Sequence, residues 1–100
     1  MVRIPAPKTI TIGGKTFEVV LDDSLIALNS KAGEFDPHRE TITIDSHLPP
    51  TSRTEVLLHE SLEAINDIWL DESLAHGDIN RLGEALLQLL NSLGVEIEWN

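Results

Sequence analysis

The spacing of the apolar residues changes at Pro49-Pro50, and this change constrains the fold more than any other feature of the sequence. Before the two prolines, short segments alternate apolar and polar residues, as half-buried strands do. After them, apolar residues recur every three or four positions, as on one face of a helix. A strand-rich half followed by a helical half is typical of α+β proteins. Because the chain has 100 residues and no linker-like segment, we expect one domain, residues 1–100, around one core.

The first half of the chain predicts a small antiparallel or mixed sheet. Residues 8–12 and 15–21 alternate apolar and polar positions on either side of Gly13-Gly14, a pattern that predicts a β-hairpin with a glycine turn. Residues 33–45 predict a short strand, a turn and a second strand. Residues 22–31 fit neither pattern.

The second half predicts two helices and a terminal strand. Ser52-Arg53-Thr54-Glu55 has the S-x-x-E spacing of a capping box, so we expect a helix from about Arg53 to Leu70. A second helix is expected from Asp78 to Leu93. Val95 to Trp99 alternates with period two and predicts a strand that pairs either with this sheet or with a neighbouring molecule. The residues expected to pack in or beside the core are Ile79, Leu82, Leu86, Leu89, Leu90 and Leu93 of the second helix and the two tryptophans, Trp69 and Trp99.

The composition excludes several classes of function. Seventeen acidic and seven basic residues give a formal net charge of −10, which repels phosphate backbones, so we expect no direct nucleic-acid binding. Such a negative charge can simply keep a small domain soluble, or it can belong to a protein that imitates DNA. No apolar run is long enough for a membrane span and the N-terminus lacks a signal-peptide core, so we expect a cytoplasmic protein without membrane contact. The chain has no cysteine, and any metal site must therefore use His, Asp or Glu.

Three polar residues, His59, Glu60 and Glu63, interrupt the apolar segment LLHESLEAI. Residues four apart lie one above the other on a helix, so His59 and Glu63 point the same way, with Glu60 about 100° round the axis. In the zinc-hydrolase motif HExxH the outer two residues bind zinc, and the Glu takes a proton from metal-bound water. Here Glu63 occupies the second outer position, and a carboxylate binds zinc at nearly the same length as imidazole. The alternative, a chance HExxE on a charged helix, still requires these groups to be paired or to face a cleft, because burying an unpaired carboxylate is costly.

The segments around this motif resemble the minimal zincin-like proteins of phages and bacteria. The residues that carry the resemblance are GEFD at 33–36, ETITID at 40–45, Leu48-Pro49 and EVLLHESLEAI at 55–65, in the order in which that family's strand leads into "LLHExxHA". The resemblance extends over about residues 8–93, and the Ile-x-Ile-Asp strand and LLHE are its most specific parts. It implies a compact metallopeptidase-like fold, with the motif helix under a small sheet and zinc as the metal. Glu63 departs from the family pattern, which has His there, and this affects catalysis more than fold.

The resemblance also suggests a third metal ligand. A catalytic zinc site has three protein ligands and one position for water. In zincins of the Glu-ligand type the third ligand comes from the helix after the motif helix, and similar family members often carry an acidic residue near its start. This chain has His76 there. We therefore predict a His₂Glu set in which, compared with the family pattern, the second ligand is the carboxylate of Glu63 and the third is the imidazole of His76. Glu84 and Asp67 are less favoured donors; zinc is the expected ion, and an oxygen-rich site would also accept manganese or iron.

Two functions follow as predictions. The first is a small zinc-dependent hydrolase or peptidase, in which Glu60 is the catalytic base beside a metal held by His59, Glu63 and His76. Its substrate would be a peptide or protein laid along a sheet edge. The second is a catalytically inactive zincin-like module of phage or prophage origin that binds another protein through its negative surface.

Overall fold

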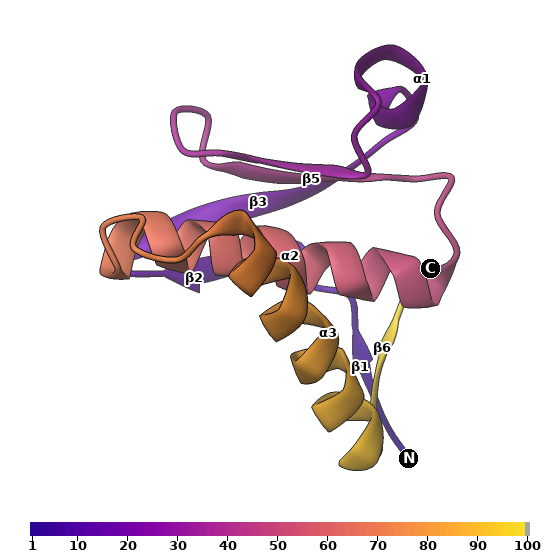
Figure 1. Cartoon of the computed structure of the whole chain (residues 1–100). Helices are drawn as coiled ribbons and strands as arrows, with labels where there is room; N and C mark the ends of the chain where they lie inside the picture. The colour runs from indigo at the N-terminus through magenta and orange to yellow at the C-terminus, as the bar shows by residue number, and fades with distance from the viewer. Residues whose placement is uncertain (100) are drawn as a thin grey trace.

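The fold is a mixed four-stranded sheet covered on one face by a long helix, as the computed structural model, which describes residues 1–99, shows in Figure 1. This architecture confirms the predicted α+β class. The strands are β1 (Val2–Pro5), β2 (Thr9–Ile12), β3 (Lys15–Asp22), β4 (Gly33–Asp36), β5 (Thr41–Asp45) and β6 (Val95–Glu98). The helices are α1 (Leu25–Asn29), α2 (Pro50–Trp69) and α3 (His76–Ser92).

The main sheet has the strand order β2-β3-β5-β4. β2 and β3 form the predicted hairpin, and its turn uses Gly13 and Gly14 at φ values of 59° and 80°, a region that favours glycine. β5 pairs in parallel with β3 and antiparallel with β4, and α1 lies in the crossover between β3 and β4. The predicted strand, turn and strand of residues 33–45 are therefore confirmed, and β4 lies at an open edge of this sheet.

The long helix α2 begins at Pro50, three residues before the predicted start. Pro49 is the N-cap residue, so the predicted capping box at Ser52 is wrong. Proline suits the first helical position, because its fixed φ is helical and the N–H that it lacks would have had no partner there. Arg53 joins the helix start to the loop after β5, since its guanidinium donates hydrogen bonds to the carbonyl oxygens of Leu48 and Ser46.

The second predicted helix, α3, also begins early, at His76 instead of Asp78. The Asp78 carboxylate accepts a hydrogen bond from the backbone N–H of Ala75 at 3.2 Å, so Asp78 caps the helix from within its first turn. His76 is consequently the first residue of α3. None of the helices within residues 1–99 is long and apolar enough to cross a membrane.

The core lies between the main sheet and α2. Its buried apolar side chains are Ile12, Phe17, Ile42, Ile44, Leu57 and Ala64. Trp99 packs beside this cluster as predicted, and its indole N–H donates a hydrogen bond to the Thr54 hydroxyl at 2.9 Å. The prediction for Trp69 is wrong: this residue ends α2 near the β2–β3 turn, and 66% of its surface is exposed.

The apolar residues of α3 face the core much less than predicted. Ile79 is buried, but Leu82, Leu89 and Leu93 are exposed, so the prediction for these three leucines is wrong. The reason is the direction of α3, which packs mainly on α2 and β6 and runs away from the main sheet (Figure 1). Only the first part of this helix therefore contributes to the core and to the site described below.

The predicted terminal strand forms as β6, and it pairs in parallel with β1. Together they make a two-stranded sheet separate from the main one. β1 is not among the predicted strands, and its partner lies at the other end of the chain.

Candidate metal centre

The three predicted ligands come together where the start of α3 crosses the middle of α2. One donor atom from each of His59, Glu63 and His76 lies within 4.8 Å of the other two. Ligands bonded to zinc at about 2.1 Å in a tetrahedron lie roughly 3.4 Å apart, so binding of an ion would draw these donors closer together. The donor set of two imidazoles and one carboxylate is one that catalytic zinc sites use. These residues therefore fit a metal ion by chemistry and by spacing.

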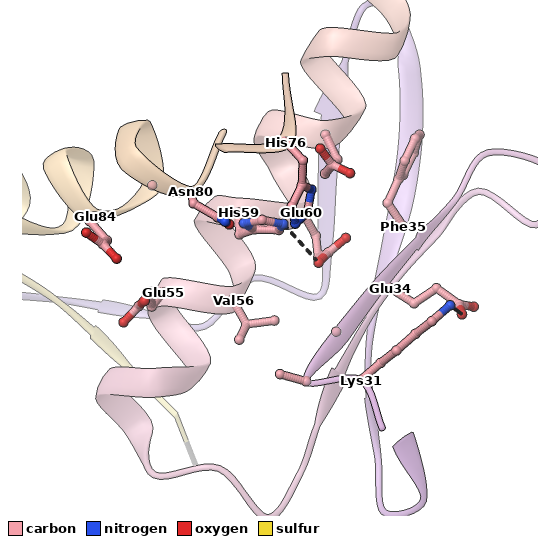
Figure 2. Close-up of a pocket in the computed structure, with 14 residues that line it drawn as sticks. Lys31, Glu34, Phe35, Glu55, Val56, His59, Glu60, His76, Asn80 and Glu84 are labelled. Atoms are coloured by element: carbon pink, nitrogen blue, oxygen red, sulfur yellow. Dashed lines mark hydrogen bonds and ion pairs between the residues drawn. The ribbon is translucent and has the colours of Figure 1, made fainter. Parts of the chain in front are cut away.

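The two imidazoles lie side by side in the structure (Figure 2). Their ring centroids are 5.1 Å apart, and the ring planes are inclined at 72°. Gly83 faces the His59 backbone at this crossing, and a Cβ at this position would make an ordinary van der Waals contact with it at 3.9 Å. The helix crossing thus brings His76, an exposed residue at the start of α3, to the partly buried His59.

Asn66 binds the loop between α2 and α3, which leads into His76. This side chain is almost fully buried in α2, and its amide oxygen accepts a hydrogen bond from the Leu74 N–H at 3.0 Å. Its amide nitrogen donates to the Leu74 carbonyl oxygen at 3.3 Å. The paired bonds fix the chain two residues before His76. The sequence offered only a weak signal for this role, a polar side chain within an apolar helix.

Burial favours the form of His59 that binds metals. The pKa of His59 is lowered chiefly because burial disfavours the imidazolium, an effect that the nearby Glu63 carboxylate partly opposes. Neutral imidazole is the form that coordinates metal ions. His59 is thus prepared for coordination at neutral pH without first losing a proton.

Glu60 lies beside these ligands with 9% of its surface exposed. Burial, followed by the negative charge of Glu63, raises the pKa of Glu60 to about 7. A hydrogen bond from the Phe35 backbone N–H acts in the opposite direction. The Glu60 carboxylate is 3.9 Å from the Nε2 atom of His59, the contact drawn as a dashed line in Figure 2. A carboxyl group with this pKa can both accept and return a proton near neutral pH.

A cavity of about 570 Å³ opens beside this group of residues, between β4, α2 and α3. Gly33 allows the edge strand to form one side of it, because a Cβ on Gly33 would overlap the Val56 side chain and approach the Glu60 side chain at 3.2 Å. The close contact between β4 and α2 thereby buries Glu60 while leaving the cavity open to an incoming molecule.

The less favoured metal donors are placed differently. Glu84 lines the same cavity from α3, outside the group of three close donors, and Asp67 is exposed and does not line the cavity. Within residues 1–99, the group near enough to share a metal ion is His59, Glu63 and His76.

The chain matches no protein-family model, no curated protein and no solved structure. The resemblance to minimal zincin-like proteins therefore stays a prediction that depends on the motif residues.

Proposed function

We propose that this protein is a zinc-dependent hydrolase of the minimal zincin type that acts on peptides or proteins. The observation that carries the proposal is the meeting of His59 and Glu63, one turn apart on α2, with His76 from α3, with Glu60 at the same cavity. A buried carboxyl group beside a three-donor metal site is the arrangement that metal-assisted hydrolysis needs.

Each residue has a distinct role in this proposal. His59, Glu63 and His76 would hold the ion, which when bound supplies a Lewis acid and lowers the pKa of a coordinated water. Glu60 accepts the proton of the attacking water and later donates it to the leaving amine. In the metal-free site its pKa of about 7 lets it take up and release a proton near neutral pH, and a bound cation would lower this pKa.

The edge strand β4 gives the substrate a place to bind. β4 pairs with β5 on one side only, and its residues 33–35 line the cavity. An extended peptide can add to such an edge through backbone hydrogen bonds, which would bring one of its amide bonds to Glu60.

Metal content tests the first part of the proposal. The untagged protein, dialysed with zinc, should hold about one ion per chain by metal analysis. His59→Ala and His76→Ala should each abolish stoichiometric binding, whereas His38→Ala, which removes an exposed histidine from the β4–β5 turn, should not. Full zinc occupancy in both ligand variants would exclude this site.

Glu60→Gln tests the catalytic part. The variant should keep zinc and lose turnover of a casein or peptide-library substrate, because Glu60 acts on water without being a ligand. Turnover at the wild-type rate would exclude Glu60 as the base.

The alternative function, an inactive acidic interaction module, is supported by the net charge of −10 and by Glu63 in place of the usual histidine. It predicts a folded protein without bound metal. The metal analysis above therefore separates the two functions.

A further inference from the structure

The cavity at the candidate metal centre has a strongly acidic lining. Five carboxyl groups line it, those of Glu34, Glu55, Glu60, Glu63 and Glu84, against one lysine, Lys31, and the two imidazoles of the candidate metal centre. The Lys31 ammonium lies 3.2 Å from the Glu34 carboxylate, so these two charges compensate one another.

Glu55 and Glu84 are the two lining carboxylates that have neither a lysine or arginine partner nor a role in the proposed chemistry, although the charge of Glu55 acts on His59. Neither forms an ion pair with a lysine or arginine of residues 1–99. Glu55 comes from α2 and Glu84 from α3, and both are exposed. Figure 2 shows both on one side of His59, with Lys31 and Glu34 on the other. The cavity therefore has one neutralised end and one negatively charged end.

A charge of this kind selects the ligand that enters. Carboxylates at the mouth of a concave, low-dielectric site focus a negative potential, which attracts cations and repels anions. The net charge of −10 adds a long-range attraction for cationic ligands. An arginine or lysine side chain that reaches both carboxylates would replace the lost water contacts with charge-assisted hydrogen bonds.

We propose that this site binds cationic peptides, with an arginine or lysine side chain held between Glu55 and Glu84 next to the amide bond to be cleaved. The inference rests on the proposed hydrolase function for the cleavage step, but the binding preference can be measured separately. Glu55 and Glu84 are here specificity-determining residues and not metal ligands.

The test is a comparison of three blocked hexapeptides, identical except for a central arginine, glutamine or glutamate. Their affinities for the zinc-treated protein are measured by calorimetry. The arginine peptide should bind about tenfold more tightly than the glutamine peptide, and the glutamate peptide more weakly still. Glu55→Gln combined with Glu84→Gln should reduce the advantage of arginine about three- to tenfold.

A matched variant separates the local effect from the charge of the whole protein. Glu18→Gln combined with Glu96→Gln makes the same change in net charge at exposed positions on β3 and β6 that do not line this cavity. It should change the arginine preference by less than about twofold. An equal effect of both double variants, or equal binding of arginine and glutamine peptides, would overturn the inference.

Zinc content and cleavage, measured on the same samples, distinguish failure of this inference from failure of the hydrolase proposal. If zinc binds and the glutamine peptide is cleaved as readily as the arginine peptide, only the specificity is refuted. If the arginine preference depends on Glu55 and Glu84 while His59→Ala leaves zinc binding unchanged, the binding site stands and the metal centre is refuted. A loss of zinc from the Glu55 and Glu84 variant would make these residues ligands and refute their assignment.

Discussion

Replacing Glu60 by glutamine should remove a pH dependence of stability that this side chain imposes on the metal-free protein. Burial raises the pKa of Glu60 from its ordinary 4.5 to about 7. Between these values the folded state holds a proton that the unfolded state has already released, so the free energy of unfolding falls as the pH rises. At 1.36 kcal/mol per pH unit, the rise in pKa corresponds to about 3 kcal/mol.

The measurement is urea unfolding in the presence of a chelator, followed by tryptophan fluorescence. Near pH 4, Glu60 is largely neutral in both states, so wild type and Glu60→Gln should have similar stability. Near pH 8 the variant should be more stable by about 3 kcal/mol, because glutamine stays neutral where Glu60 must ionise in a buried place. Titrating groups far from residue 60 contribute equally to both proteins and cancel in the difference, whereas the neighbouring Glu63 and His59 cancel only in part.

Glu84→Gln is the matched control, since it removes an exposed carboxylate from the same cavity. Its stability should follow that of the wild type across this pH range. Added zinc should reduce the difference between wild type and Glu60→Gln, because a nearby positive charge favours the carboxylate. Parallel pH profiles for wild type and Glu60→Gln without metal would refute the buried position assigned to Glu60.

Three further outcomes follow from the packing around the site. Gly33→Ala should lower the free energy of unfolding by about 1–3 kcal/mol in urea, because its Cβ would overlap the Val56 side chain. Asn66→Ala should weaken zinc binding about tenfold in a competition titration with little loss of helical circular dichroism, because it frees the loop before His76. Exchanging the ligands, Glu63→His with His76→Glu, should retain one zinc per chain by metal analysis, whereas His76→Glu alone should bind zinc more weakly.

The elements that the sequence predicted correctly are those whose signals are local. The β2–β3 hairpin follows from strict alternation around Gly13-Gly14, and α2 follows from helical spacing after Pro49-Pro50. Strand β1 was missed because its four residues are stabilised by β6, more than ninety positions away, and nothing local marks them. The exposed leucines of α3 were misassigned for a similar reason, since an apolar stripe does not indicate how far a partner surface extends.

In the candidate site, too, the features that could be predicted are those that depend on local spacing. His59 and Glu63 share a face because any helix places residues four apart together, so their proximity could be read from spacing. The burial of Glu60 depends instead on the contact between Gly33 and α2, which is tertiary. Likewise, sequence could not decide between His76 and Glu84, because both lie on α3 and only the packing of α3 on α2 brings a His76 nitrogen within 4.8 Å of the other two donors.

The exchange of ligands between Glu63 and His76 should be tolerated because both arrangements keep two imidazoles and one carboxylate. As the chain stands, an oxygen of the Glu63 carboxylate lies within 4.8 Å of a nitrogen of the His76 imidazole. The N-terminus of a helix carries a partial positive charge, which stabilises a nearby carboxylate by roughly 0.3–1 kcal/mol. In the exchanged protein the new glutamate would occupy the first position of α3 and gain this interaction, while the two imidazoles would lie one turn apart on α2. The donor set and the local charge are then both conserved. If the wild-type protein binds zinc and the exchanged protein does not, the positions of the donors, and not their types, determine this site.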